Sequence, residues 1–346
     1  MDDYYDYAEA RQEIDRQAKE KNTDKVNKKY QLCTWEGGIA SKCKTITAPA
    51  SRTTRLVTVI ESTKEVEEAV LSLQGVLVDM DLPPLNSRPR PQQLRHIRQS
   101  ISLSGLGQVS FGDAVSNLYG LHTMLARQVP PGALEKWQPS EFKGFVSLDI
   151  SNRYFTLRRY ADGAGKVPFD KLTDPAGYLE DINGQDMVHT DDNQVDFYSA
   201  ASSGAQRVSP STFRVGDIVE ACLSVVMTPV SSEKYKMMLV LRSLAQIKCS
   251  LTMDAETKRN VAQYNDSVRT DTNILKRRRA YSTEERAACS SQTAPEGASS
   301  SQQLQPNQAG PSEPVLQRRR GVSDTAGTER VVDENGDVPM YRMLDS

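Results

Sequence analysis

Two neighbouring runs of residues decide the fold. Arg214-Val215-Gly216-Asp217 leads into an alternating run from Ile218 to Thr228, and a second apolar run extends from Tyr235 to Ile247. In the first run every second residue is apolar: Val219, Ala221, Leu223, Val225 and Met227. This period of two is typical of a strand with one buried face. The second run is apolar on both faces, as in a central strand, so the two predict an antiparallel hairpin whose loop is Pro229–Lys234.

A second hairpin is predicted upstream of the first. Phe145–Ile150 and Tyr154–Leu157 have strand composition and are separated by the turn-prone pair Ser151-Asn152. Together the two hairpins predict a compact antiparallel β barrel or sandwich over residues 136–255.

Residues 51–135 are predicted to be mainly helical. After a short β-like run, Leu56–Ile60, the following apolar residues are three or four apart: Val66, Val70, Leu73 and Leu77. This spacing favours a helix from Ser62 or Thr63 to Asp81, ended by Pro83-Pro84. A second helix is expected from Asp113 to Arg127.

The two ends of the chain are poor in apolar residues. Residues 1–50 are expected to form a charged, partly disordered arm. Residues 256–346 are expected to form a disordered tail that is first basic and then acidic. Neither end has enough apolar surface to bury to offset the conformational entropy lost on ordering. The fold class is therefore α+β: a helical N-terminal region, a small antiparallel β barrel or sandwich, and disordered termini.

Charge and composition exclude several classes of protein. Among 346 residues, 43 Lys and Arg oppose 45 Asp and Glu, so nucleic-acid binding must be local rather than driven by net charge. No apolar run reaches the roughly 18 residues of a membrane span. The acidic start is unlike a signal peptide, and the five cysteines are interpreted as reduced thiols. We expect a location in the nucleus or cytoplasm, no secretion and no membrane partner.

Cations and flat rings gather in two stretches near the middle of the chain. Leu82–Gly112 contains arginines and no acid, and in Arg153–Tyr160 arginines are interleaved with aromatic residues. This combination binds single-stranded nucleic acid, because rings stack on bases and guanidinium groups neutralise phosphates. The structural alternative is that the rings pack in the core and the arginines solvate a face. The candidate residues are Arg88, Arg90, Arg95, Arg98, Arg153, Tyr154, Arg158, Arg159 and Tyr160.

A compact basic cluster at the start of the tail suggests a second partner. Its residues are Lys276, Arg277, Arg278 and Arg279. Exposed runs of this kind are bound by nuclear import receptors, whereas the simpler interpretation is a solvated tail.

An acidic stretch supplies the enzymatic alternative. Residues 172–206 contain seven acids and no Lys or Arg, and within them His189, Asp191 and Asp192 are ligand types for a divalent ion that could activate water in a hydrolase. No calcium-loop spacing and no second histidine accompany them, so a solvated acidic loop is the favoured interpretation, with no metal and no cofactor. These acids could also pair with the arginines and occlude them.

Motifs for nucleophilic catalysis or phosphate binding by a glycine-rich loop do not occur in the sequence. We therefore expect a non-enzymatic binding protein. A third hypothesis is a protein-interaction module that uses an open sheet edge for a partner strand.

Four segments carry a resemblance to a known set of proteins: Asp186–Asn193, Phe213–Glu220, Val225–Val230 and Lys234–Leu244. They resemble an uncharacterised family expanded in mushroom-forming (basidiomycete) fungi, over about residues 140–250. The resemblance implies no activity. It implies that the acidic segment around His189 and the second hairpin belong to one unit.

Overall fold

The hairpin predicted at residues 218–247 lies at the centre of the sheet in a computed structural model, which describes residues 1–24, 27–37, 40–60, 64–161, 163–184, 186–201 and 204–271. Strands β12 (Ile218–Pro229) and β13 (Tyr235–Lys248) pair antiparallel. The turn before β12 is confirmed, because Asp217 N donates to Arg214 O at 3.0 Å. The buried Asp217 carboxylate then accepts from Gln246 Nε2 at 2.7 Å and Thr252 Oγ1 at 2.8 Å, which ties this turn to the elements that follow it.

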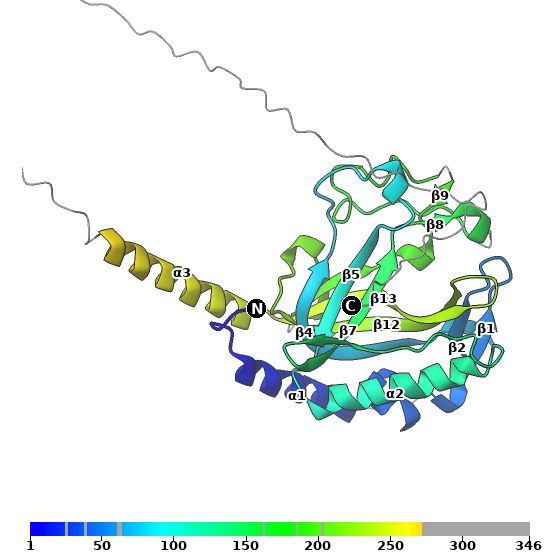
Figure 1. Ribbon diagram of the computed structural model, residues 1–346, viewed down its shortest axis with the longest axis horizontal. Helices are drawn as coiled ribbons and strands as arrows, with labels where there is room; N and C mark the ends of the chain where they lie inside the picture. The colour runs from blue at the N-terminus through cyan, green and yellow to red at the C-terminus, as the bar shows by residue number, and fades with distance from the viewer. Residues whose placement is uncertain are drawn as a thin grey trace, which may run out of the picture. The chain divides into compact units, whose positions relative to one another are not determined.

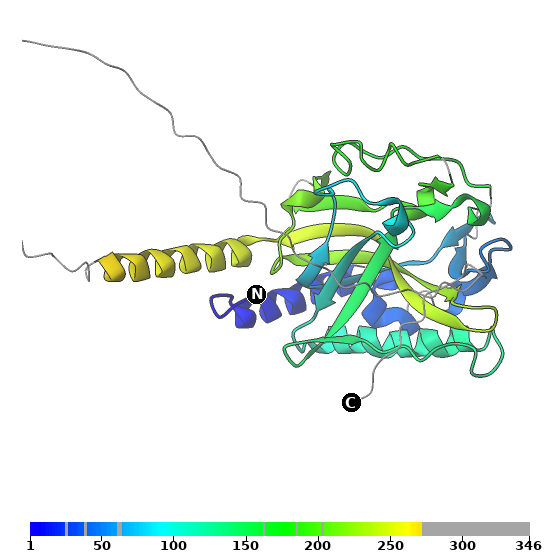
Figure 2. The same cartoon turned by 45° about the horizontal axis from the view of Figure 1, so that its top comes forward.

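Five strands form a partly open barrel in the order β13-β12-β4-β5-β7 (Figures 1 and 2). The three strands added to the hairpin are β4 (Val70–Asp81), β5 (Arg98–Ser104) and β7 (Phe145–Arg153). The sheet curls until β7 approaches β13, where Asn152 Nδ2 donates to Leu241 O at 3.1 Å. No described backbone ladder joins β7 to β13. We call this opening the seam.

Shorter strands extend the sheet beyond the barrel. Strand β6 (Ser140–Phe142) pairs with β7 at one end of the sheet. At the other end β10 (Asp196–Ala201) pairs with β13, and β11 (Gly204–Arg207) pairs with β10. A meander of β1 (Cys43–Thr47), β2 (Thr54–Val59) and β3 (Val66–Glu68) joins through β2, which pairs with β12. A separate two-stranded sheet is formed by β8 (Thr156–Leu157) and β9 (Met187–Val188).

Three α-helices accompany the sheet in the part of the chain that the structure describes: α1 (Tyr7–Thr23), α2 (Val109–Ala126) and α3 (Ser250–Asp271). The fold class is α+β, as the sequence predicted. None of the described helices is long and apolar enough to cross a membrane.

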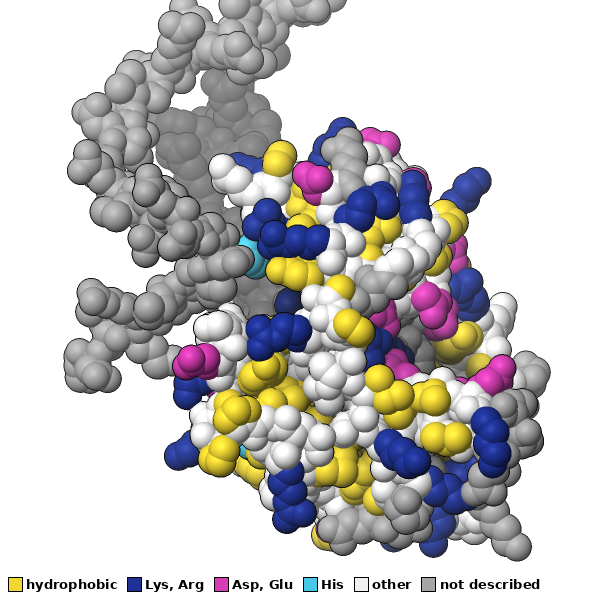
Figure 3. All heavy atoms as spheres, turned by 90° about the vertical axis from the view of Figure 1, so that its right-hand side faces the viewer, with side chains coloured by type: hydrophobic (Ala, Val, Ile, Leu, Met, Phe, Trp, Pro, Cys, Tyr) yellow, Lys and Arg dark blue, Asp and Glu magenta, His cyan; other side chains and the backbone are white. Residues whose placement is uncertain are grey.

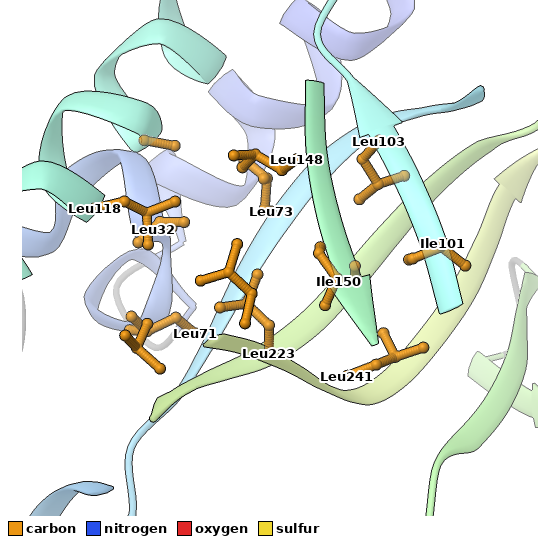
Figure 4. Close-up of a cluster of buried hydrophobic side chains, with 14 of the residues drawn as sticks. Leu32, Leu71, Leu73, Ile101, Leu103, Leu118, Leu148, Ile150, Leu223 and Leu241 are labelled. Carbon is orange, nitrogen blue, oxygen red and sulfur yellow. The ribbon is translucent and has the colours of Figure 1, made fainter. Parts of the chain in front are cut away.

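One hydrophobic core joins α2 to the barrel. Figure 4 shows Leu118 and Leu32 on one side of a group of leucine and isoleucine side chains that the barrel strands direct toward one another. Each side chain of this size contributes about 1.5–3 kcal/mol when it is fully buried. Because β4 and β5 pair with β12 and β7, residues 51–135 and 136–255 share this core.

The helix predicted up to Asp81 is wrong, because Val70–Asp81 is strand β4. Seven successive residues of this strand, Leu71–Leu77, are buried. A strand covered on both faces has no alternation for sequence analysis to detect, and here the pairing with β12 and β5 prevails over the apparent helical spacing. The helix predicted from Asp113 exists but begins at Val109.

The hairpin predicted at residues 145–157 is also wrong. Ser151 and Asn152 continue β7 and pair with β5, so they form no turn. The next residues leave the barrel and β8 pairs with β9 instead. The reason lies in a non-local contact: the Asn152 side chain is directed across the seam to β13, which keeps the strand extended to Arg153.

Both ends contain more structure than expected. Helix α1 begins at Tyr7 and buries Ala10, Ile14 and Ala18, which are four residues apart, so this part of the predicted arm is a packed helix. Helix α3 includes the first part of the predicted disordered tail, as far as Asp271. The rest of that tail lies outside the described residues.

Candidate nucleic-acid interface

The turn Asp191–Asn193 fills the seam of the barrel. Its backbone carbonyls accept three hydrogen bonds from barrel side chains: Asn152 Nδ2 to Asp192 O at 2.9 Å, Arg242 Nη1 to Asp192 O at 2.6 Å, and Gln99 Nε2 to Asn193 O at 3.2 Å. The acidic segment is therefore part of the barrel's closure.

Its histidine has a structural environment. His189 is buried, its Nδ1 lies 2.8 Å from Tyr154 O, and its ring stacks on Phe169 with centroids 3.9 Å apart. Burial lowers the pKa of His189, although the hydrogen bond from its ring to the Tyr154 carbonyl acts to raise it. Among the described residues no group of three or more His, Cys, Asp or Glu is arranged to hold a metal ion, so His189, Asp191 and Asp192 do not form the ligand set of the hydrolase alternative.

Four arginines from four strands surround the seam: Arg55 of β2, Arg98 of β5, Arg153 of β7 and Arg242 of β13. We call them the arginine cluster.

Two members of the cluster have acidic partners. The Arg55 guanidinium donates two hydrogen bonds to the Asp192 carboxylate, and Arg242 Nη2 donates to Glu68 Oε1 at 2.6 Å. Burial alone would raise the pKa of Asp192, but the hydrogen bond and charge of Arg55, with the charge of Arg242, hold it below its ordinary value. Asp192 is therefore a carboxylate already engaged by cations.

The other two members lack such partners. Arg98 and Arg153 lie directly opposite each other in the β5–β7 ladder, and neither guanidinium makes a hydrogen bond or ion pair with any residue that the structure describes. Burial lowers the pKa of Arg153, and the nearby charges of Arg98, Arg55 and Arg242 lower it further, although Asp192 opposes them. Both side chains are half-buried, so each guanidinium is partly removed from water without a partner, and a bound anion would offset the free-energy cost.

A pocket of about 420 Å³ opens beside Arg153. We call it the seam pocket, and the residues of its lining that matter here are Arg55, Arg153, Tyr160, Thr190, Asp191 and Asp192. Its volume is within the roughly 300–1,000 Å³ usual for small-ligand sites. Figure 3 views the molecule from the side of β1, β2, β8 and β9, where Lys and Arg side chains are spread over the face with acidic ones among them.

Tyr160 supplies a flat ring to this pocket. It is 37% exposed, and Arg159 Cζ lies 4.8 Å from the centroid of its ring. A guanidinium over one face of the ring is a favourable cation–π contact.

The predicted set of site residues is divided by the structure. Arg98, Arg153, Arg159 and Tyr160 lie at or beside the seam, whereas Tyr154, only 1% exposed, packs with Phe155, Leu179 and Met187. Its prediction as a base-contacting residue is wrong, because after β7 the chain leaves the barrel and buries Tyr154 in a separate apolar cluster.

The remaining predicted arginines lie elsewhere. Arg158 Nη2 donates to Gly184 O at 2.7 Å, and Arg88 forms an exposed ion pair with Asp181 at 3.4 Å. Arg90 and Arg95 are exposed in the loop of residues 82–97 that joins β4 to β5. Lys276–Arg279 lies outside the described residues, so its recognition by an import receptor stays a prediction.

Sequence reasoning missed Arg55 and Arg242. They lie far from the predicted stretches along the chain, and only strand pairing brings them to the seam. Arg242 had one local signal, since it interrupts an otherwise apolar central strand.

Comparisons with known proteins give little further information. No protein-family model and no curated protein matches the sequence. Among solved structures, gp2.5, a single-stranded DNA-binding protein encoded by bacteriophage T7, matches with a TM-score of 0.33 and 9% identity over 52% of this chain and 86% of that chain. The single-stranded DNA-binding protein of bacteriophage Enc34, in complex with DNA, matches with a TM-score of 0.31 and 9% identity over 60% of this chain and 96% of that chain. Likenesses this weak carry no inference about this chain.

Proposed function

We propose that the chain binds single-stranded nucleic acid at the seam, with a phosphate on Arg153 and a base on Tyr160. The observation that supports this most is the Arg153 guanidinium, which lines the seam pocket and has no partner among the described residues. Phosphate is an anion that accepts parallel hydrogen bonds from a guanidinium. An adjacent exposed ring adds stacking worth about 1–3 kcal/mol per base.

The barrel gives a second, weaker support by analogy. Partly open barrels of five strands bind oligonucleotides or oligosaccharides on the face of their second and third strands and with the loop between the first two. In this chain the second and third strands are β5 and β7, which carry Arg98 and Arg153. The loop between the first two, residues 82–97, carries Arg88, Arg90 and Arg95.

The surface of β5 and β7 beyond the two arginines is unsuited to phosphates. Ser100 and Ser102 of β5 lie opposite Ser151 and Asp149 of β7, and the Ser102 hydroxyl donates to the Asp149 carboxylate. Asp79 of β4 is exposed beside this row. The path that avoids these acids extends from the seam pocket toward the loop of residues 82–97.

The test is a charge-removing substitution at the proposed contact, Arg153→Gln, with Arg127→Gln as the matched control. Arg127 is exposed at the C-cap of α2 and does not line the seam pocket. Fluorescence anisotropy with labelled DNA and RNA oligonucleotides of about 12 nucleotides measures Kd.

We expect Arg153→Gln to raise Kd about tenfold at about 50 mM salt, and to reduce the slope of log Kd against log salt by about 0.7, the value for one phosphate of a single strand. Arg127→Gln leaves both quantities nearly unchanged. Absence of binding by the unaltered protein at this salt concentration, or an equal effect of the two substitutions, would refute the proposal.

A further inference from the structure

Among the described residues that line the seam pocket, Asp191 is an acid that the closure of the barrel does not use. Asp191 is exposed and lines the pocket, and its carboxylate makes no hydrogen bond or ion pair with any described residue. Its neighbour Asp192 differs, because Arg55 engages that carboxylate. The pocket therefore offers a guanidinium, a ring and an available carboxylate, at Arg153, Tyr160 and Asp191.

The backbone of Asp191 is held firmly in place. It lies between Thr190 and Asn193, both buried, and Thr190 N donates to Asn193 Oδ1 at 3.0 Å while Asn193 N donates to Thr190 O at 2.9 Å. Gln194 N closes the turn by donating to Asp191 O at 3.1 Å. Because this turn is also bonded to the barrel across the seam, a ligand meets a carboxylate whose backbone is already ordered, which reduces the entropy lost on binding.

A carboxylate in this position discriminates among bases, because it can only accept hydrogen bonds. Guanine has two adjacent donors on its Watson–Crick edge, N1–H and the N2 amino group, and these fit the two carboxylate oxygens. Cytosine and adenine offer one amino donor each, next to an acceptor nitrogen. Thymine and uracil offer N3–H between two carbonyl oxygens, which repel a carboxylate. Two parallel charge-assisted bonds are stronger than one and more demanding in geometry.

We infer that the seam pocket selects guanine, with Asp191 accepting from its Watson–Crick edge, Tyr160 stacking on the base and Arg153 binding the phosphate. This inference rests on the proposed function. The competing role for Asp191 is a solvated acid that repels phosphate, and it predicts a different result: its removal would then strengthen binding of every sequence alike.

The experiment uses the full chain and labelled oligothymidylates of about 12 nucleotides, each with one central position occupied by guanine, inosine, adenine, cytosine or thymine. Inosine keeps N1–H and lacks the 2-amino group. We expect the guanine oligonucleotide to bind about tenfold more tightly than the all-thymine one, with inosine between them. Asp191→Asn should remove this preference, since an amide presents one acceptor and one donor.

Asp186→Asn is the matched control, because Asp186 is exposed, lies in the same segment and does not line the pocket. This variant should keep the preference for guanine. Three results would overturn the inference while the proposed function stands: equal affinity of the unaltered protein for all five oligonucleotides, a guanine preference that survives in Asp191→Asn, or a uniform gain of affinity in that variant. Binding of no oligonucleotide at all would overturn the proposed function and this inference together.

Discussion

Asn152→Leu tests the idea that the seam is closed by side chains. Asn152 is buried, and its Nδ2 donates to Asp192 O at 2.9 Å and Leu241 O at 3.1 Å. Leucine has a similar size but no donor, so both hydrogen bonds are lost. Asp192 O keeps its bond from Arg242, whereas the carbonyl of the fully buried Leu241 loses its side-chain donor. Two lost hydrogen bonds at about 1 kcal/mol each, plus part of the desolvation penalty of a buried acceptor, give a destabilisation of about 2–4 kcal/mol.

The assay is urea denaturation followed by the fluorescence of Trp35 and Trp137. The midpoint should fall while the slope m stays unchanged, because the surface exposed on unfolding is nearly the same. Oligonucleotide affinity, measured where the variant is folded, should also decrease, since the turn that carries Asp191 loses an anchor.

Asn117→Leu is the control for this substitution. Asn117 Nδ2 likewise donates to two carbonyls, Leu32 O at 2.8 Å and Cys33 O at 3.1 Å, but it lies on α2 and away from the seam pocket. It should lower stability and leave binding unchanged. A midpoint of Asn152→Leu within the error of the unaltered protein would refute the closure of the seam by this side chain. Equal loss of binding in both variants would refute its link to the pocket.

Two further predictions concern the acidic segment. Burial lowers the pKa of His189 from 6.5, so the unfolded chain binds a proton that the folded chain does not, and stability should fall as pH decreases below about 6.5. In urea titrations at a series of pH values, His189→Phe should remove this component of the pH dependence, whereas His96→Gln, at an exposed histidine, should not. Full pH dependence in His189→Phe would contradict the assignment. Asp192→Asn removes a negative charge that interacts with Arg55, Arg242 and Arg153, so oligonucleotide affinity should rise about threefold to tenfold in anisotropy titrations at low salt. An unchanged or lower affinity would contradict phosphate binding beside Asp192.

The seam explains why charged residues gather at this place in the barrel. Where no described backbone ladder joins β7 to β13, Asn152 donates to the Leu241 carbonyl of β13. Asn152, Gln99 and Arg242 donate to carbonyls of the turn that fills the seam. Those donors are structural. Arg153 lies beside them and forms no hydrogen bond or ion pair with a described residue, which distinguishes a candidate binding residue from arginines that stabilise the fold.

Only part of the candidate site could be predicted from the sequence. Arg153 and Tyr160 were found because cations and rings are interleaved within eight residues, a pattern visible without any fold. Tyr154 belongs to the same pattern and was predicted wrongly, since the sequence does not show that Tyr154 is buried in a separate apolar cluster after β7. Arg55 could not be found, because its approach to Arg153 depends on the pairing of β2 with β12.

The elements whose signal is local could be predicted from the chain's residues alone: the Arg214–Asp217 turn, the paired strands β12 and β13, the run that became β2, and most of α2. Their periodicity of two or of three to four can be detected within one stretch of chain. That Val70–Asp81 is a strand follows from long-range pairing, because burial on both faces removes the periodicity and the pairing with β12 and β5 then selects the conformation. The seam pocket likewise depends on tertiary structure, since side chains far apart along the chain converge only where the curled sheet brings β7 toward β13.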